Sequence, residues 1–255
     1  MFDANIGVIS NFFKEVVYTS TYERQEAILN YLKENKHSTI KELSKLVWSS
    51  ESSVRRDIKS LEQKGYVKQV YGAVVSAEHE NSIVPVALRD SSNILIKETL
   101  AKKAVNHIFS GATIFMDGST TVRQIIKHID KFKELKIITY NQRIFSECTH
   151  PNIKLYCTGG LFNMQNGIFY GSAAENYINN TSADLFFFSS QALSYDGEAS
   201  DVYEEETSIR KAMLARSKKK IFLCDSSKLG LQKTFKLCTK DDIDLIICDK
   251  KLPWE

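Results

Sequence analysis

A short polar loop rich in hydroxyl side chains follows an apolar stretch of the chain. Asp117-Gly118-Ser119-Thr120-Thr121 comes directly after the apolar residues 112–116 and before a helical pattern that begins at Val122. Free backbone N–H groups and the dipole at a helix start favour anions, and hydroxyls add further donors. The loop is therefore predicted to bind an anion. The alternative is that Ser119 or Thr120 only caps the helix, which is common in α/β proteins.

Other polar loops follow apolar stretches later in the chain: Thr139-Tyr140-Asn141, Thr158-Gly159-Gly160 and Asp225-Ser226-Ser227-Lys228. Each is a weak signal alone, because Gly-Gly is usually a turn and a lysine is usually on the surface. An acidic segment ending in Glu204-Glu205-Glu206 either complements a helix N-terminus or presents a carboxylate to ligand hydroxyls. No G-x-x-x-x-G-K-[ST] loop is present, so a sugar or polyol phosphate fits better than a nucleoside triphosphate.

These loops require a sheet that brings them to one edge. Apolar stretches alternate with helical patterns at residues 112–116, 136–140, 154–157, 185–188, 221–224 and 245–248. This alternation predicts an α/β fold with a mainly parallel sheet covered by helices on both faces. Ligands of such sheets bind at the carboxyl ends of the strands, where all of these loops would lie.

The N-terminal part has a different pattern, with three short helices and a hairpin. Ile28, Leu29 and Leu32 recur at helical spacing, Thr39 and Glu42 fit a capping box, and Ser50 is placed to cap a third helix. The polar residues 34–38 are expected to form a turn, and residues 66–70 and 73–76 to form a hairpin around Tyr71-Gly72. This order is typical of a winged helix-turn-helix.

The third of these helices has a face suited to DNA. Val54, Ile58 and Leu61 form its apolar side, whereas Arg55, Arg56 and Lys59 lie with Ser52 and Gln63 on a polar and basic stripe. Arginine contacts guanine edges or phosphates, and hydroxyls and free N–H groups suit the phosphate backbone. The alternative is that these charges only solvate a helix face. The predicted DNA contacts are Thr39, Ser50, Ser52, Ser53, Arg55, Arg56 and Lys59.

Composition is that of a globular protein, with 43% hydrophobic and 25% charged residues among 255. Residues 22–70 contain ten Lys or Arg and seven Asp or Glu, so the formal net charge of +3 is concentrated there. No apolar run approaches the length of a membrane helix and no secretory signal is visible, so we expect a soluble cytoplasmic protein. The five cysteines include no C-x-x-C pair, which predicts buried free thiols and neither a metal nor a cofactor.

The expected domains are an unassigned N-terminal extension (1–21), a winged helix-turn-helix (22–76), a linker (77–92) and an effector-binding α/β domain (93–255). The linker is rich in polar residues and contains Pro85.

Four segments of the N-terminal part form a specific pattern: Glu23-Arg24-Gln25-Glu26-Ala27-Ile28-Leu29, Ile40-Lys41-Glu42-Leu43-Ser44, Ser53-Val54-Arg55-Arg56-Asp57-Ile58 and Leu61-Glu62-Gln63-Lys64-Gly65-Tyr66-Val67. Together they resemble the DNA-binding region of DeoR-family repressors. The wing departs from the family pattern, which has an arginine before the turn and Gly-Gly within it, whereas this chain has Gln69-Val70-Tyr71-Gly72-Ala73 there. The polar loops that follow the apolar stretches, the acidic segment ending at Glu206 and Gly171 resemble the sensor domain of the same family in the same order.

This resemblance implies a sensor domain similar to ribose-5-phosphate isomerase, which binds a phosphorylated sugar or polyol, and a homo-oligomer, dimer or tetramer, that reads a repeated operator in double-stranded DNA. The predicted effector contacts are Asp117, Gly118, Ser119, Thr120, Thr121, Asn141, Gly159, Gly160, Glu205 and Lys228. Basic residues that the family often has after the Gly-Gly pair are replaced by residues 161–166, so the effector's identity does not transfer.

A ligand-responsive repressor is the leading interpretation, with no catalytic residues. One alternative is a sugar-phosphate isomerase in which Asp117, Glu205 and Lys228 transfer protons and the helix-turn-helix is accessory. Another is an activator or nucleoid binder, which differs from a repressor only in where it binds.

Overall fold

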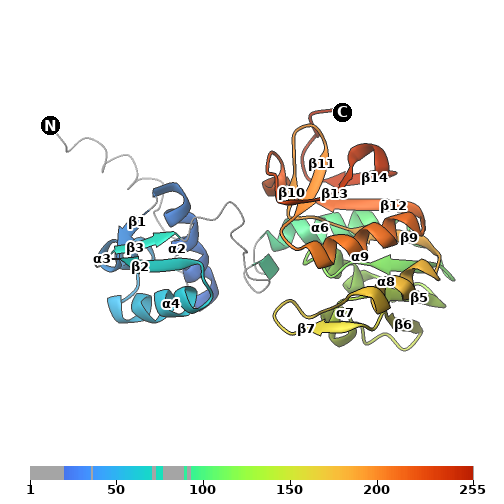
Figure 1. Ribbon diagram of the computed structural model, residues 1–255, viewed down its shortest axis with the longest axis horizontal. Helices are drawn as coiled ribbons and strands as arrows, with labels where there is room; N and C mark the ends of the chain where they lie inside the picture. Colours follow the sequence, from blue (N-terminus) through green and yellow to red (C-terminus); the bar gives the residue numbers. More distant parts are fainter. Residues whose placement is uncertain (1–19, 36, 71–72, 77–88, 91–92, 255) are drawn as a thin grey trace. The chain divides into compact units, whose positions relative to one another are not determined.

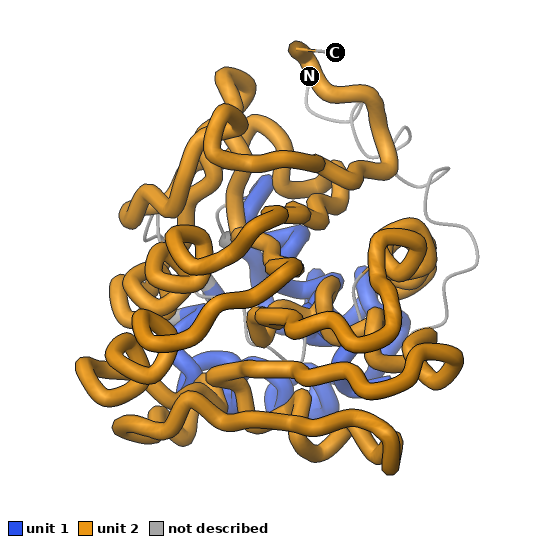
Figure 2. Tube along the Cα trace, turned by 90° about the vertical axis from the view of Figure 1, so that its right-hand side faces the viewer, with its two compact units in different colours: residues 1–91 blue, residues 92–255 orange. Residues whose placement is uncertain are grey.

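The computed structural model describes residues 20–254 apart from residue 36 and residues 71–72, 77–88 and 91–92. The chain divides into two compact units, Met1–Ser91 and Ser92–Glu255 (Figures 1 and 2). Three predicted features lie wholly or largely outside the described residues: the N-terminal extension, the wing turn at Tyr71-Gly72 and the linker.

The first unit is a helix-turn-helix with a small antiparallel sheet, as the sequence predicts. Its described elements are α2 (Thr21–Asn35), β1 (His37–Thr39), α3 (Ile40–Leu46), α4 (Glu51–Gln63), β2 (Val67–Val70) and β3 (Ala73–Ser76). Ile28, Leu43 and Ile58, one from each helix, are fully buried in a common core. The spacing of apolar residues therefore places the three helices correctly.

Strand β1 corrects one expectation. The polar residues 34–38 were expected to form a turn, but His37–Thr39 pairs with β3, so that Ser38 lies opposite Val74 and the sheet order is β1-β3-β2. Such pairing is made by backbone groups, which the polar side chains of this segment do not reveal.

The second unit is built on a six-stranded parallel sheet. Its described elements are α6 (Ile94–Val105), β4 (Thr113–Met116), the 3₁₀ helix η1 (Val122–His128), β5 (Leu135–Thr139), α7 (Gln142–Glu147), β6 (Ile153–Cys157), β7 (Leu161–Asn163), β8 (Ile168–Tyr170), α8 (Ser172–Asn179), β9 (Ala183–Phe188), β10 (Ala192–Leu193), β11 (Glu198–Asp201), α9 (Glu204–Ala215), β12 (Ser217–Cys224), the 3₁₀ helix η2 (Ser226–Lys228), β13 (Phe235–Thr239), the 3₁₀ helix η3 (Lys240–Asp242) and β14 (Leu245–Cys248).

The order of the parallel strands reverses at the middle of the sheet, between β4 and β9, and this reversal point corresponds to the crevice of doubly wound sheets. The order is β14-β12-β9-β4-β5-β6, so the chain first builds outward from β4 and then returns to add β9 on its other side. Ligands of doubly wound sheets bind where this reversal occurs, outside the carboxyl ends of the strands. Here that position lies between the loops after β4 and β9.

Two hydrophobic cores cover the two faces of the sheet. Leu100 of α6 and Ile125 of η1 pack on the face that includes Ile114. Met213 of α9 packs on the other face, against phenylalanine side chains of the central strands such as Phe186. The predicted two-sided α/β architecture is confirmed, and with it the predicted fold class.

Short antiparallel strands decorate this sheet and were not predicted. Strands β7 and β8 form a hairpin, and β10, β11 and β13 form a three-stranded sheet. They have only two to five residues each, so they are too short to give the periodic signal by which the longer elements were predicted.

Candidate functional site

Helix α4 presents the predicted DNA-binding face to solvent. Its N-cap is Ser50, whose hydroxyl accepts from the Ser53 N–H at 3.2 Å and lies 2.9 Å from the Ser52 hydroxyl. The side chains of Ser52, Arg55, Arg56 and Lys59 are exposed, and Ser53 is half-buried. Thr39 is also exposed but lies at the start of α3, where it forms the predicted capping box with Glu42. The helix thus offers one exposed cationic stripe with hydroxyls at its N-terminal end.

A buried ion pair fixes the orientation of this helix. Asp57 is 3% exposed on the inner side of α4 and accepts hydrogen bonds from Arg24 of α2, at 2.5 Å from Nε and 3.1 Å from Nη2. Gln25 donates to the same carboxylate at 3.4 Å. The hydrogen bond to Asp57 raises the pKa of Arg24 above its ordinary value, although burial opposes this. Sequence reasoning missed this pair; its only signal is a carboxylate between the core positions Val54 and Ile58.

The wing is also tied to α4. Glu62 accepts from the backbone N–H of Gln69 at 2.8 Å and from its side-chain amide at 3.3 Å. Gln69 belongs to the segment that departs from the family pattern. In this chain it connects β2 to α4.

Asp117 bridges the crevice between β4 and β9. One of its carboxylate oxygens accepts from the Ser119 N–H at 2.9 Å, and the other accepts from the Ser189 N–H at 2.8 Å. The side chain is fully buried. Asp117 therefore holds its own loop and the end of β9 together.

The hydroxyls of the same loop divide between capping and other positions. The Ser119 hydroxyl accepts from the Val122 N–H at 3.2 Å, as the capping alternative expects. Thr120 and Thr121 are buried, and within the described part of the chain the Thr121 Oγ1 atom has no hydrogen-bond partner. Capping thus accounts for Ser119 but not for the two threonines.

Asn141 lies against Gly118 and joins the loop after β5 to the loop after β4. A Cβ atom on Gly118 would lie 2.0 Å from the Asn141 Nδ2 atom, so no larger residue fits there in this arrangement. The Asn141 Oδ1 atom accepts from the Arg143 N–H at 2.9 Å and caps α7. The two predicted contact residues are thus brought together.

Lys228 supplies a cation at the same crevice. Its Nζ atom donates to the Ser189 hydroxyl at 2.8 Å and lies 3.4 Å from an oxygen of Asp225. Burial acts to raise the pKa of Asp225, but the charge of Lys228, a hydrogen bond from Ser227 and the charge of Lys97 outweigh it and lower that pKa. Lys97 of α6 is itself 3% exposed and was not predicted. Asp117 and Lys228 thus meet through Ser189, which binds one with its N–H and the other with its hydroxyl.

The remaining predicted contacts lie apart from this group. Glu205 is exposed in the first turn of α9 and, among the described residues, makes no hydrogen bond or ion pair with another predicted contact. Gly160 has a φ of +109°, and a Cβ atom there would lie 2.5 Å from the Tyr170 carbonyl oxygen. Gly159 also has a positive φ, of +68°. Gly160 therefore permits the close approach of the chain just before β7 to the end of β8, which by itself is a structural role.

Arg210 of α9 is the main charged residue that sequence reasoning missed. It lies 3.0 Å from a carboxylate oxygen of Asp201, 3.2 Å from one of Glu206 and 3.8 Å from one of Asp117. It also donates to the Ser189 carbonyl at 2.8 Å. Burial raises the pKa of Asp201 to about 6, although the charge of Arg210 opposes it. This network connects α9 and β11 to the crevice, and its partners are too far apart in sequence to be recognised as one group.

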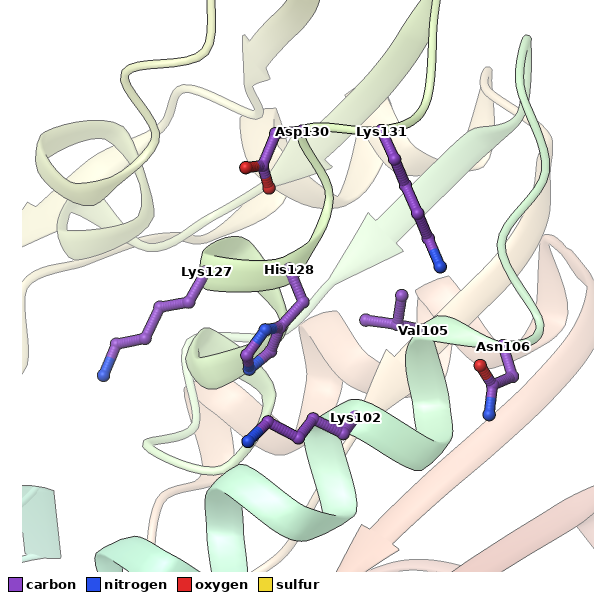
Figure 3. Close-up of a pocket in the computed structure, with 7 residues that line it drawn as sticks. All are labelled: Lys102, Val105, Asn106, Lys127, His128, Asp130 and Lys131. Carbon is purple, nitrogen blue, oxygen red and sulfur yellow. The ribbon is translucent and has the colours of Figure 1, made fainter.

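Two cavities lie elsewhere and include none of the predicted effector residues. One, of about 390 Å³, lies between α6 and the segment around η1 and is lined by Lys102, Val105, Asn106, Lys127, His128, Asp130 and Lys131 (Figure 3). The other, of about 790 Å³, lies at the amino ends of β5 and β6, where Lys136 and Lys154 line it. For the effector, hydrogen-bonding geometry and strand order favour the carboxyl-end crevice over these cavities.

Family comparisons cover both units. Residues 24–80 match the family model described as the DeoR-like helix-turn-helix domain, and residues 92–250 match that of the DeoR C terminal sensor domain. The HTH-type transcriptional regulator GolR of Listeria innocua is 32% identical, with 91% of each chain covered. An uncharacterised HTH-type transcriptional regulator of Haemophilus influenzae is 33% identical, covering 91% of this chain and 90% of the relative. The transcriptional repressor AccR of Agrobacterium fabrum is 25% identical over 92% of each chain.

Two solved structures are similar to this chain at lower sequence identity. eIF2B delta from Chaetomium thermophilum aligns over 92% of each chain with a TM-score of 0.50 and 13% identity. Ribose 5-phosphate isomerase from Plasmodium falciparum aligns over 52% of each chain with a TM-score of 0.39 and 18% identity. Within the described ranges, no helix is both long and apolar enough to cross a membrane.

Proposed function

Because the chain belongs to the DeoR family of transcriptional regulators, we propose that it represses genes of sugar or related carbon metabolism and leaves its operator when a phosphorylated sugar or polyol binds. Residues 22–76 would bind DNA, residues 77–92 would link the units, and residues 93–255 would bind the effector. We place its action in the cytoplasm as a homo-oligomer, in which two copies of α4 read a repeated site.

The observation that carries the effector half is the position of Lys228. Its ammonium group is held 2.8 Å from the Ser189 hydroxyl, at the reversal point of the sheet and beside the Asp117 loop. A cation, buried threonine hydroxyls and a helix start together suit a phosphate group, and neighbouring amide and hydroxyl groups suit a sugar. Asn141 is the amide nearest to this loop.

The geometry supports a sensor over an isomerase. Both carboxylate oxygens of Asp117 already accept backbone N–H bonds that join its loop to the end of β9, so the geometry assigns this side chain a structural role instead of proton transfer to a substrate. Glu205, the other acid of that alternative, is exposed and separate. Sugar-phosphate turnover by the full chain would overturn this choice.

The first experiment is a thermal-shift screen of the full chain with pentose, hexose and glycerol phosphates, each beside its unphosphorylated parent. A ligand that binds the folded state raises the midpoint by mass action. A rise that requires the phosphate supports the proposal. A rise with the parents alone, or none with any compound, contradicts the phosphorylated effector.

The second experiment measures release of DNA. DNA sites are first selected by the protein from a randomised pool and labelled with a fluorophore. Binding of the protein is then followed by fluorescence anisotropy while the sugar or glycerol phosphates found in the screen are added. Lys228→Ala is expected to raise the concentration needed for release about tenfold or more while ligand-free binding stays unchanged. The matched control is Lys211→Ala, an exposed lysine of α9. An unaltered dose response of the Lys228 variant would remove Lys228 from the site.

A further inference from the structure

Two cysteines face each other at the ends of neighbouring strands. Cys224 is the last residue of β12, Cys248 is the last residue of β14, and the parallel pairing places them directly opposite one another. Neighbouring strands lie about 4.8 Å apart, and opposite residues of a parallel pair point to the same face. This spacing is within the range of about 4.4–6.8 Å between the Cα atoms of a disulfide. Both side chains belong to the core on the α9 side of the sheet.

The two thiols differ in access and in acidity. Cys224 is fully buried, whereas Cys248 is only partly buried. The thiol of Cys224 donates a hydrogen bond to Cys248, which lowers the pKa of Cys248 to about 7 against the opposing effect of burial. The same hydrogen bond, together with burial, raises the pKa of Cys224. Cys248 therefore has the thiolate character and the solvent access of a cysteine that reacts first with an oxidant. Cys224 has the position of the second cysteine, which closes the disulfide.

We propose that Cys224 and Cys248 form a redox modification site, which a peroxide converts to a disulfide. The Cys248 thiolate attacks one peroxide oxygen, the O–O bond breaks and Cys248 becomes a sulfenic acid as hydroxide leaves. The Cys224 sulfur then attacks the Cys248 sulfur, so that the S–S bond forms, the S–O bond breaks and water leaves with the thiol proton. Overall the two thiols lose two electrons and two protons, and hydrogen peroxide is reduced to two molecules of water.

The cross-link would lie at the base of the Lys228 segment. Cys224 directly precedes Asp225, and Cys248 directly precedes Asp249, whose carboxylate accepts from the Ser226 N–H at 2.6 Å and from its hydroxyl at 2.8 Å. Joining the two strand ends shifts the residues that position Lys228. We therefore extend the proposal to a change in effector affinity on oxidation, a part that rests on the proposed function.

The chemical part is tested on the full chain without any effector. The protein is treated with hydrogen peroxide, unreacted thiols are alkylated, and peptides are mapped by mass spectrometry. The expected product is a Cys224–Cys248 cross-linked peptide that dithiothreitol removes. The half-buried Cys148, outside the pair, supplies the control: Cys148→Ser is expected to retain the product, and Cys248→Ser to lose it.

The same peptide mapping also gives the results that would refute the proposed redox modification site. Oxidation of Cys248 to sulfinic acid with Cys224 still alkylated, or disulfides that join other cysteines in preference to this pair, would refute it. Because these readouts come from the wild-type chain, they do not depend on whether Cys224→Ser folds.

The regulatory part compares reduced and oxidised protein in the sugar-phosphate thermal-shift series. A ligand-dependent shift that changes on oxidation in wild type but not in Cys248→Ser supports it. An identical shift in the two redox forms would overturn it while leaving the mapped disulfide intact. If no sugar phosphate binds the reduced protein, the proposed function fails, and the mapping still decides the modification site.

Discussion

Arg55 and Asp57 stand two positions apart on α4, in opposite environments that give them different roles. The Arg55 side chain is 64% exposed and lies 3.6 Å from Glu51, whereas the Asp57 side chain is 4% exposed and holds Arg24. An exposed ion pair is weak and can be exchanged for contacts with another molecule, but breaking a buried ion pair leaves an uncompensated charge. At this scale α4 separates the face proposed to contact DNA from the face that anchors the helix.

Arg55→Ala is expected to reduce discrimination between the selected DNA sites and scrambled sequence. The loss is about 1 to 3 kcal/mol if the guanidinium contacts a base edge, because no other group replaces its paired donors. Anisotropy with both DNAs measures it, and Lys103→Ala, an exposed lysine of α6, is the control. A uniform loss on both DNAs would assign Arg55 to phosphate instead.

The stability contribution of Asp201 is expected to fall as pH rises from about 4 to 6. Burial, opposed by the charge of Arg210, gives this carboxyl a folded-state pKa of about 6 against an ordinary value of 3.8. The folded state then holds the proton more tightly than the unfolded state. The contribution of Asp201 to stability is therefore complete below the pKa of the unfolded state and is lost as the pH rises through the pKa of the folded state. The upper limit of that loss is about 3 kcal/mol.

Asp201→Asn tests this sign, because its amide does not titrate. The free energy of unfolding of the variant minus that of wild type should rise over that pH range. Asp196→Asn is the opposite case, since a hydrogen bond from Ser194 lowers the pKa of the exposed Asp196. A flat difference curve for Asp201→Asn would refute the raised pKa.

At the scale of elements, a few side chains determine how the helices sit. The Asp57–Arg24 pair connects α4 to α2, Glu62 connects α4 to β2, and the Thr39 capping box begins α3. The orientation of the predicted recognition helix therefore depends on contacts made on its inner side.

Asp57→Ala is expected to destabilise the first unit by about 2 to 3 kcal/mol, because it leaves the Arg24 guanidinium without its buried partner. Hydrogen exchange of the α4 amides reports this unit separately from the sheet unit. The control is Glu51→Ala, which removes an exposed pair on the same helix and should change stability by less than about 0.5 kcal/mol. Equal effects of the two variants would show that the buried pair does not hold α4.

Elements with strong periodicity could be predicted, and those held by partners distant in sequence could not. Val54, Ile58 and Leu61 indicate α4, and apolar runs such as residues 185–188 indicate the central strands. Strand β1 exists only because β3 pairs with it. In the site, the Asp117 loop was recognised from its position after a strand. Its partner Ser189 lies 72 residues away in the sequence. Arg210 belongs to α9, for which the sequence drew attention only to the acidic residues of the first turn.

At the scale of the whole molecule, the proposed function joins two sites that each unit can form by itself. The first unit has its own core and an exposed cationic helix, and the second has its own core and the crevice at the sheet reversal. Because each unit has its own core, release of the DNA does not require either unit to unfold. It must come from an effector that binds more tightly to the DNA-free arrangement.

Linkage therefore predicts reciprocal effects. If a sugar phosphate found in the thermal screen lowers DNA affinity by some factor, DNA must lower affinity for that phosphate by the same factor. We expect a factor of about 10 to 100, equivalent to about 1.4 to 2.7 kcal/mol of coupling. Arg55→Ala should weaken DNA binding and leave the factor unchanged, because in the proposed complex its side chain contacts the DNA and not the effector. Anisotropy at increasing ligand concentration and calorimetry with and without DNA measure the two factors. Unequal factors would mean that ligand and DNA compete through a third species, such as a change in oligomeric state, and the two-site mechanism would have to be replaced.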